Sequence, residues 1–582
     1  NFMCIFLPGF DFKMTATSVL SRATKRLLTH RSALNIYSKY QSLWTSDKIV
    51  KSPFEDVDIP NITIPDQVWK NLDKWADKPA LVCGITNRTY TYQQAYKYSH
   101  NFAARLRSKL GIRDKDVVCI MMPNSPEYGL AVLGTLQAGA EVTTANPIYT
   151  AHEVSKQLLL SNPKVIIGVT ETITVIKEAL KLAKTDIPII CVKTVNQSIS
   201  PGTISFEELA LDNNVDHSVL KDVSKKPEDI AFLPYSSGTT GLPKGVELHN
   251  RNILTNLLQL DVDKVRHHTE TTSTSQDSTL GILPFFHIYG LVVVLLHKLS
   301  VGQKLVTLPK FQPNTFMNAM KEHKINLLVA APPIVLFCAS HKDVTKDHLG
   351  HLRVMTSGAA PLPIHDVHRV FEKCAPGMNF IQMYGMTETS PVATSMIPGE
   401  DNYSSSGYAL SNTELKVIDS EMRSLGPNEV GELLVRGPQV MKGYRNNLEA
   451  TKAAITEDGW YKSGDLAMID MNGVVTIADR LKELIKVKGY QVPPAELESL
   501  LKEHSSILDA AVIGIPDDKQ GEAPKAFIVV KDGHKLHKDE VKKFVEERVA
   551  PYKRLKDVLF IDAIPKNPSG KILRRVLKEK YC

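Results

Sequence analysis

The sequence predicts an α/β protein: a large N-terminal domain of stacked, parallel-rich sheets with helices and a small β-barrel-like subdomain, then a small, mobile α+β domain. The chain has 582 residues, more than one compact core usually holds. Short Val-, Ile- and Leu-rich runs alternate with helical stretches, as is typical of parallel sheets covered on both faces. After residue 479 the chain becomes lysine-rich for about 100 residues, the size of a small domain.

The strand predictions rest on short apolar runs separated by turn residues. Val117–Met122 predicts a buried strand, Pro-Asn-Ser-Pro a turn, and Glu127–Ala138 a helix. Further apolar runs predict strands at 165–169, 187–192, 230–234, 304–308, 327–330, 431–436 and 473–478. In sheets of this kind, ligands bind at the loops that follow the carboxyl ends of the strands.

These patterns divide the chain into a basic leader (1–50), a large domain (51–479) and a small domain (480–582). Between Met14 and Ser46 the leader contains no acidic residue and is rich in Ser, Thr and Leu. This composition resembles a mitochondrial transit peptide, and a cytosolic location is the alternative. The C-terminal Lys-Tyr-Cys does not match the Ser-Lys-Leu peroxisomal address.

An apolar segment at Leu280–Leu296 is shorter than the ~20 residues that a membrane-spanning helix needs. It also contains Pro284, His287 and Gly290, so it predicts a buried strand, turn and helix rather than a transmembrane segment.

Charge and cysteine content restrict the partners. Residues 480–582 hold 22 Lys+Arg against 16 Asp+Glu, which favours polyanions such as ATP or coenzyme A, or simply a solvated surface. No arginine cluster is interleaved with aromatic residues, which argues against nucleic acid. The seven cysteines show no CxxC spacing, which argues against a disulfide framework or a zinc cluster. The oligomeric state is not encoded in these patterns, and a monomer is expected.

The most informative segment is YSSGTTGLPKG, residues 235–245, which lies between two apolar runs. Its glycines, among them Gly238 and Gly241, allow close backbone approach to a ligand. Donors come from the hydroxyls of Ser236, Ser237, Thr239 and Thr240 and from the ammonium group of Lys244. Such a loop can hold nucleotide phosphates, although the GxxxxGK[ST] spacing of a Walker loop is absent.

This loop closely resembles the signature of the adenylate-forming superfamily, which includes acyl-CoA synthetases, coumarate–CoA ligases, beetle luciferases and peptide-synthetase adenylation domains. The resemblance extends from about residue 66 to residue 580. It implies an AMP-binding large domain and a ligase that converts a fatty or arylpropenoic acid to its acyl-adenylate and then to an acyl-CoA thioester. AMP and pyrophosphate are the other products, ATP and coenzyme A the co-substrates, and Mg2+ the cofactor.

The resemblance assigns roles to the motif QMYGMTE, residues 382–388. Tyr384 would stack on adenine beside Gly385, Thr387 would contact the α-phosphate, and Glu388 would bind magnesium. The loop Gly358, Ala359 and Ala360 would pack on the adenine face.

Two further motifs complete the nucleotide site by the same resemblance. Asp465 in YKSGD would bind the ribose hydroxyls, with Arg480 as a second ribose or phosphate contact. Lys571 in PKNPSGK would bridge the substrate carboxylate and the α-phosphate, where two anions must meet.

The small domain is expected to swing about a hinge at Asp479 or Lys482 between the two half-reactions. Two sets of residues would alternate in the cleft: Lys486 and Gln491 at the adenylate, then Lys488, Gly489 and Tyr490 at the pantetheine tunnel.

The acyl pocket is expected to include Tyr235, His287, Ser357, Met383 and Met386, with His287 as a gate between the acyl and pantetheine channels. Coumarate–CoA ligases and luciferases have glycine where this chain has Met383. The methionine side chain would fill part of the pocket, which disfavours an extended aromatic acid.

Three alternatives remain open from the sequence. A luciferase-like oxygenase would share the adenylation step. A peptide-synthetase module would need a carrier domain after Lys571. A nucleotide-binding pseudoenzyme would be expected to have lost Lys571, Glu388 or Asp465, and all three are present.

Overall fold

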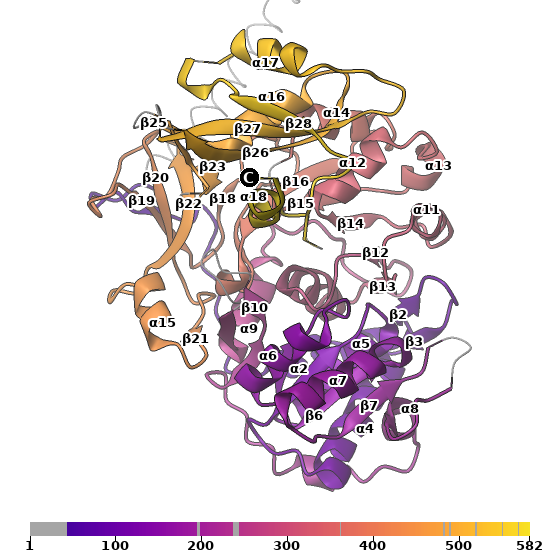
Figure 1. Cartoon of the computed structure of the whole chain (residues 1–582). Coiled ribbons are helices and arrows are strands. Elements are labelled where there is room, and N and C mark those ends of the chain that lie inside the picture. Colours follow the sequence, from indigo (N-terminus) through magenta and orange to yellow (C-terminus); the bar gives the residue numbers. More distant parts are fainter. Residues whose placement is uncertain are drawn as a thin grey trace, which may run out of the picture.

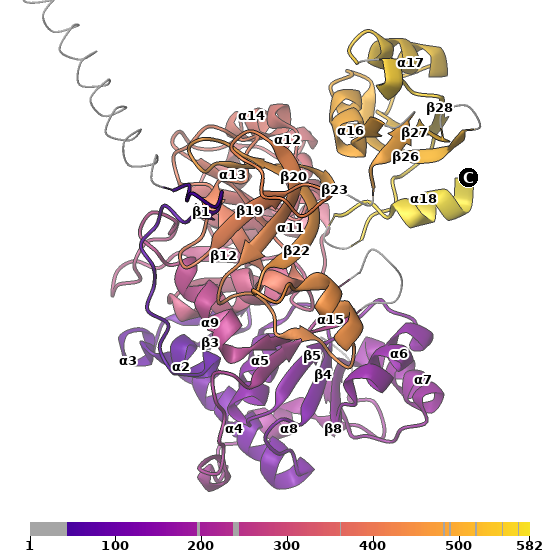
Figure 2. The same cartoon turned by 90° about the vertical axis from the view of Figure 1, so that its left-hand side faces the viewer.

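Four β-sheets organise the part of the chain that the structure, a computed structural model, describes (Figure 1). The described residues are 43–194, 198–236, 244–360, 362–480, 483–487, 490–517, 521–549, 551–567 and 570–581. Three sheets belong to the large domain and the fourth to the C-terminal domain, which Figure 2 shows as a separate body at one end of the molecule. The expected α/β fold class is confirmed.

The first sheet has a parallel centre that helices cover. Its parallel strands are β9 (Ile230–Leu233), β5 (Glu141–Thr144), β4 (Val117–Met121), β6 (Val165–Val169), β7 (Ile189–Val192) and β8 (Ile204–Ser205). Its helices include α4 (Tyr92–Leu110), α6 (Ala151–Ser161), α7 (Ile173–Ala183) and α8 (Phe206–Ala210). The antiparallel strands β11 (Lys244–His249), β10 (Tyr235–Ser236) and β21 (Gly443–Tyr444) extend it. The phosphate-loop segment therefore joins two antiparallel strands, unlike a Walker loop.

The second sheet repeats this plan. Its parallel strands are β16 (Asn379–Gly385), β15 (Val354–Ser357), β14 (Leu327–Ala330), β12 (Ser278–Gly281), β13 (Lys304–Thr307) and β2 (Pro79–Cys83). Antiparallel strands β17 (Val392–Ser395), β18 (Tyr408–Ala409) and β3 (Thr89–Thr91) form the edges. Its associated helices are α10 (His297–Ser300), α11 (Pro313–Glu322), α12 (Pro332–Ser340), α13 (Lys346–Leu349) and α14 (Ile364–Phe371). Helix α9 (Asn250–Gln259) contacts β9 and β11 of the first sheet.

One hydrophobic core joins the two nine-stranded sheets through helix α5 (Pro126–Gln137) and the π-helical segment η3 (Tyr289–Leu296). A Cβ atom on Gly129 of α5 would lie 3.1 Å from Leu81 and 3.2 Å from Leu295, so the missing side chain permits this close packing. Strand β12, a turn and η3 confirm the buried strand, turn and helix predicted at 280–296. Among the described helices, none has the length and apolarity to cross a membrane.

The third sheet is antiparallel, with strands β1 (Val50–Lys51), β19 (Glu414–Ile418), β20 (Val430–Arg436), β22 (Tyr461–Ile469) and β23 (Val475–Arg480). Strand β1 pairs with β19, and the Trp44 indole donates a hydrogen bond to the Asp470 carbonyl over 3.0 Å. The leader boundary expected at residue 50 therefore falls inside a strand. Leu43 already belongs to the hydrophobic core of this sheet. Residues 1–42, with most of the expected leader, lie outside the described residues.

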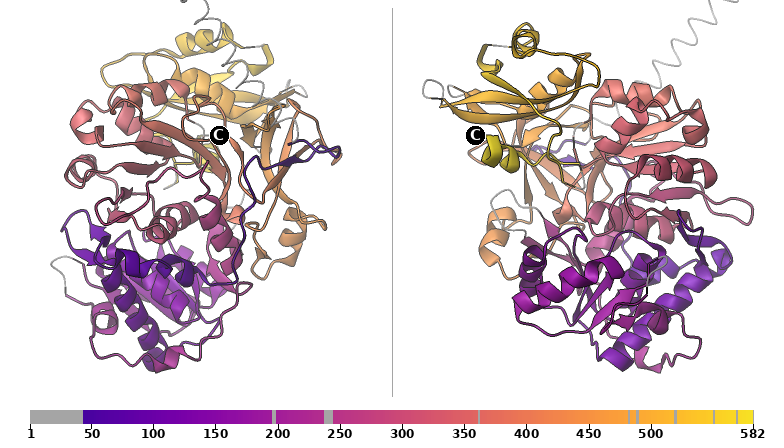
Figure 3. Two further views of the ribbon diagram at one scale, coloured as in Figure 1. Left: turned by 180° about the vertical axis from the view of Figure 1, so that it is seen from behind. Right: turned by 45° about the vertical axis from the view of Figure 1, so that its right-hand side comes forward.

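The C-terminal domain is α+β, as predicted. Its sheet consists of β25 (Tyr490–Val492), β24 (Ile485–Val487), β27 (Gly521–Val530), β26 (Ile507–Asp517) and β28 (Asp557–Phe560), and its helices are α16 (Pro494–Lys502), α17 (Lys538–Glu546) and α18 (Arg574–Tyr581). A core that includes Leu497, Val512 and Val558 belongs to this domain alone. Both views of Figure 3 show this domain, in yellow, at the end of the molecule opposite the purple part of the chain.

Two strand predictions shift by a few residues for local reasons. The strand expected at 187–192 begins at Ile189, after Pro188, which has no N–H for the sheet ladder. The strand expected at 473–478 is 475–480, because Gly473 has φ 83° and forms a turn.

Candidate active site

A cavity of about 250 Å³ lies between the large domain and the C-terminal domain. It brings together seven of the residues expected at the site: Ala359, Ala360, Met383, Tyr384, Gly385, Asp465 and Lys571. The first five lie at the ends of β15 and β16, Asp465 lies in β22, and Lys571 comes from the C-terminal domain. Loops at the carboxyl ends of parallel strands thus form one wall, as the sequence predicted.

Tyr384 and Asp465 fix each other's positions across this cavity. The Tyr384 hydroxyl donates a hydrogen bond to Asp465 Oδ2 over 2.7 Å. The Asp465 N–H donates to Ser463 Oγ over 3.0 Å, and Ser463 Oγ donates to the Leu433 carbonyl over 2.6 Å. The two residues expected at adenine and ribose are therefore neighbours, held by strands from two different sheets.

The loop after β15 approaches β16 closely. A Cβ atom on Gly358 would lie 2.8 Å from the Met383 carbonyl oxygen, so only glycine fits without displacement. Ala359 has φ 74°, a left-handed conformation that is uncommon for a residue other than glycine. This conformation brings Ala359 and Ala360 to the cavity wall beside Tyr384.

Lys571 reaches the cavity because Gly570 permits close contact with the large domain. Gly570 has φ 85°, and a Cβ atom there would lie 2.7 Å from Pro333 Cδ at the start of α12. The Lys571 N–H donates to Asn567 Oδ1 over 2.8 Å, which closes the turn that carries it. The interface therefore depends on the absence of a side chain next to the lysine.

Arg574 and Lys566 of the C-terminal domain also line the cavity and form ion pairs within that domain. Arg574 pairs with Glu498 over 2.7 Å and also with Glu483, and Lys566 pairs with Asp509 over 2.5 Å. The sequence reasoning missed Arg574 and Lys566. The only available signal was their closeness to Lys571 in the chain, which does not reveal pairing.

A second group of residues surrounds Glu388. Lys244 Nζ lies 4.8 Å from the centre of the Tyr444 ring, and the Tyr444 hydroxyl donates to Glu388 Oε1 over 2.9 Å. The pairing of β11 with β21 places Tyr444 there. Burial and the nearby Glu388 carboxylate raise the pKa of Tyr444, so its hydroxyl remains a proton donor. Thr387, in the same short 3-10 turn as Glu388, is also buried.

Glu388 fits the expected magnesium site by its donor chemistry. Mg2+ prefers oxygen ligands and is usually held by one or two carboxylates together with substrate phosphates. The Glu388 carboxylate is 7% exposed and lies near Lys244, at the end of the phosphate loop. This arrangement suits a metal that a polyphosphate helps to bind.

Of the five residues expected in the acyl pocket, the cavity lining includes one. Met383 lines the cavity, whereas the cavity lining does not include Tyr235, His287, Ser357 or Met386. The Tyr235 hydroxyl donates to the Gln157 carbonyl over 3.1 Å, and Ser357 is fully buried. Burial lowers the pKa of His287 to about 4, so its ring is neutral at pH 7, and its Nδ1 accepts a hydrogen bond from the Tyr289 N–H over 3.3 Å.

Several expected site residues cannot be placed. Ser237, Gly238, Thr239, Thr240, Gly241, Lys482, Lys488 and Gly489 lie outside the described residues, as do the side chains of Asp479, Arg480, Lys486, Tyr490 and Gln491. Ser236 lies in β10, directly before the undescribed part of the loop. The backbone places Arg480 opposite Asp465 on β22 and β23, and Lys486 opposite Gln491 on β24 and β25.

Two segments of the chain match known protein families. Residues 68–445 match the AMP-binding enzyme family, and residues 496–571 match the AMP-binding enzyme C-terminal domain. The boundary predicted at 479/480 lies between the two matches. The chain is 40% identical over 541 residues to 4-coumarate–CoA ligase 3 of Oryza sativa subsp. japonica, which covers 92% of this chain and 95% of the rice protein.

Solved structures share the fold over nearly the whole of their length. ATP-bound MatB from Rhodopseudomonas palustris matches with a TM-score of 0.79 at 27% identity, covering 90% of this chain and 99% of that chain. The anthranilate CoA ligase AuaEII in complex with anthranoyl-AMP matches with a TM-score of 0.78 at 26% identity, covering 90% and 98%. The match across 68–445, together with 40% identity to a relative of nearly equal length, shows that the chain belongs to the AMP-binding enzyme family.

Proposed function

We propose that the chain is an AMP-forming acid–thiol ligase that activates a carboxylic acid with ATP and transfers the acyl group to coenzyme A. The observation that carries the proposal is the meeting of Lys571 with Tyr384 and Asp465 around one cavity. A cation from the C-terminal domain and a nucleoside-binding surface from the large domain are the two parts that adenylation needs in the same place.

In the first step a substrate carboxylate oxygen attacks the α-phosphorus of ATP. An O–P bond forms, the bond between the α- and β-phosphates breaks, and pyrophosphate leaves. Asp465 accepts hydrogen bonds from the ribose hydroxyls, and the Tyr384 ring packs on the base. Lys571 places its positive charge where the carboxylate and the α-phosphate approach, which offsets their repulsion.

The second cluster holds the phosphate end of the nucleotide. Lys244 supplies positive charge at the end of the phosphate loop, and Thr387 offers a hydroxyl to the α-phosphate. Glu388, oriented by the Tyr444 hydroxyl, would hold Mg2+. When bound, Mg2+ neutralises charge that accumulates on the departing pyrophosphate.

In the second step the sulfur of coenzyme A attacks the acyl carbon of the adenylate. A C–S bond forms, the C–O bond to AMP breaks, AMP leaves, and the thiol proton passes to solvent. The placement of Lys571 in the cavity corresponds to the first step, so the C-terminal domain would turn about the segment 479–482 before the second. This domain rotation would bring residues 488–489, which connect β24 to β25, toward the cavity.

The acid is an arylpropenoic or a fatty acid. Kinship with a coumarate–CoA ligase at 40% identity supports the first, and Met383 at the cavity wall supports a narrower or flexible chain. A mass-spectrometric screen of acyl-CoA products with aromatic, medium-chain and long-chain acids distinguishes them.

The decisive experiment measures acid-dependent pyrophosphate release by wild type and Lys571→Ala. Loss of one charge-stabilising group typically lowers kcat by about 100- to 1,000-fold, and we expect a loss of that order. Lys566→Ala is the matched control, because Lys566 is another lysine of the same domain that lines the same cavity, and it pairs with Asp509. If Lys571→Ala released pyrophosphate at the wild-type rate, or if both variants lost it equally, the role proposed for Lys571 would be wrong.

A further inference from the structure

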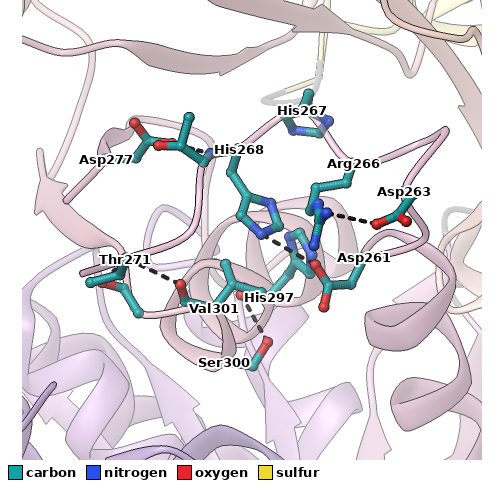
Figure 4. Close-up of polar contacts among 12 residues, drawn as sticks. Asp261, Asp263, Arg266, His267, His268, Thr271, Asp277, His297, Ser300 and Val301 are labelled. Atoms are coloured by element: carbon teal, nitrogen blue, oxygen red, sulfur yellow. Dashed lines mark hydrogen bonds and ion pairs between the residues drawn. The ribbon is translucent and has the colours of Figure 1, made fainter. Parts of the chain in front are cut away.

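A cluster of histidines lies outside the cavity described above, on the segment that connects α9 to α10. Asp261 follows α9, His268 lies in the loop before β12, and His297 is the first residue of α10. Figure 4 shows the three side chains converging, with Asp277 and Thr271 nearby but turned to other partners. Neither the nucleotide cavity nor the Glu388 group includes any of the three.

The structure assigns a binding site for a divalent transition metal, with Zn2+ as its natural probe, to Asp261, His268 and His297. Two imidazole nitrogens and one carboxylate oxygen are a ligand set that Zn2+ commonly takes, with water as the fourth ligand. Sequence reasoning excluded only a cysteine-based zinc cluster, and this set contains no cysteine.

The spacing of the donor atoms fits such an ion. His268 Nε2 and Asp261 Oδ1 are 3.2 Å apart, and one donor atom from each of the three residues lies within 4.8 Å of the others. Ligands at ~2.0–2.1 Å from a tetrahedral ion are about 3.3 Å apart. The histidine–carboxylate pair already has this spacing, and His297 would need to move by no more than about 1.5 Å.

The nitrogen atoms of His297 support the assignment independently. His297 is fully buried, and its Nε2 has no hydrogen-bond partner among the described residues. A buried nitrogen without a partner is rare in native proteins and needs an explanation. Its other nitrogen, Nδ1, lies 3.3 Å from Lys298 Nζ, so Nε2 is the nitrogen of this ring without a partner in the described chain.

Two cationic side chains lie near the proposed ligands: Arg266, and the buried Lys298, whose Nζ lies 3.1 Å from His267 Nε2 and 3.3 Å from His297 Nδ1. The neighbouring Arg266 is neutralised by Asp263 over 2.6 Å. His268 also borders an open recess of about 430 Å³ that is lined by His267 and Arg353, which gives an ion and a fourth-ligand water a path from solvent.

A metal here would act on stability rather than on catalysis. It would tie the loop 261–268 to α10, the helix that continues directly from η3 in the main core. An ion that binds only the folded chain raises its melting temperature in proportion to the logarithm of the ion concentration.

The test uses the whole chain after treatment with a chelator, dialysed against Zn2+ and analysed for bound metal and for Tm. We expect one equivalent of zinc and a zinc-dependent rise in Tm for wild type. Asp261→Asn and His268→Gln should each lower zinc affinity by at least the roughly 10- to 100-fold that loss of a supporting residue costs. Asp263→Asn is the matched control, since it removes a nearby carboxylate that belongs to the Arg266 pair.

Two further measurements keep the outcome decisive. Co2+ bound to wild type should give the intense visible absorption of a four-coordinate site, and Zn2+ should displace it, even if a variant fails to fold. Acid-dependent pyrophosphate release, unchanged in Asp261→Asn, shows that this variant is folded.

Absence of stoichiometric zinc in wild type would mean that Asp261 and His268 form an ion pair only. Equal zinc affinity in Asp261→Asn and Asp263→Asn would place the metal elsewhere. Either result overturns the inference and leaves the proposed ligase function untouched.

Discussion

The nucleotide cavity and the histidine cluster are built in opposite ways. The cavity draws Ala359, Tyr384, Asp465 and Lys571 from β15, β16, β22 and the C-terminal domain, whereas the cluster comes from one stretch, 261–297. Yet the sequence predicted the dispersed site and missed the local one. Each piece of the cavity lies in a motif with several constrained residues, while the ligands of the cluster have irregular spacing in loops and helix ends.

The two regions also differ in how their polar groups are satisfied. Around the cavity, Tyr384 pairs with Asp465 and Arg574 with Glu498, and the surface is open to ligands. In the cluster, His297 is fully buried, and its Nε2 has no hydrogen-bond partner in the part of the chain that the structure describes. We therefore expect changes at the cavity to alter catalysis with little effect on Tm, and changes at the cluster to do the reverse.

After Lys571→Ala, the largest effect should come from Gly570→Ala. The added Cβ would meet Pro333 at 2.7 Å, so the Lys571 turn could not reach the cavity without displacement. A strained backbone of this kind costs about 1–3 kcal/mol, or roughly 5- to 150-fold in adenylation rate. Pyrophosphate release measures this step. Thioester formation from preformed acyl-adenylate should suffer less, because the domain then has another orientation.

Gly533→Ala is a close control for this prediction. Gly533 lies in the same domain with φ 77°, and a Cβ atom there would meet nothing within 4 Å. It carries the same conformational strain without the contact. Equal losses of adenylation in the two variants would show that the approach to Pro333 does not matter.

Met383→Ala should change which acid is used. Met383 is 6% exposed at the cavity wall, and its truncation would leave room for a bulkier acid. Differences of this size in an apolar pocket alter kcat/KM by about 10-fold or more. The measurement is the kcat/KM ratio of an arylpropenoic acid to a shorter acid. Met386→Ala, which truncates a methionine packed against the core, should leave that ratio unchanged.

Tyr444→Phe should have a smaller effect, on magnesium dependence. It removes the hydrogen bond to Glu388 but keeps the ring beside Lys244. Such a bond is worth about 0.5–1.5 kcal/mol, so the Mg2+ concentration for half-maximal rate should rise a few-fold. Tyr408→Phe removes a similar bond, to Glu400 over 3.1 Å, and should leave the magnesium requirement unchanged. If Tyr444→Phe needed no more Mg2+ than wild type, Tyr444 would have no role in orienting Glu388 for magnesium.

Tyr444 also shows where sequence reasoning ended. Strands such as Val165–Val169 and Leu327–Ala330 were predicted to the residue, because a fully buried strand needs an unbroken apolar run. The motif residues Tyr384, Asp465 and Lys571 were predicted together by resemblance. Tyr444 was not, because it meets Glu388 and Lys244 only through the pairing of β11 with β21. Contacts that depend on register between distant strands leave no local pattern in the sequence.

The smallest effect concerns His287, which lies before η3, whereas His297 of the cluster lies directly after it. Burial holds the pKa of His287 at about 4, below its ordinary value of 6.5. Between these values the unfolded chain binds a proton that the folded chain does not, so folding stability falls as pH decreases from about 6.5 to about 4. His287→Gln lacks the imidazole that binds this proton in the unfolded chain. Between pH 7 and pH 5, the Tm of wild type should therefore fall more than the Tm of His287→Gln. Parallel Tm curves would show that burial does not lower the pKa of this histidine.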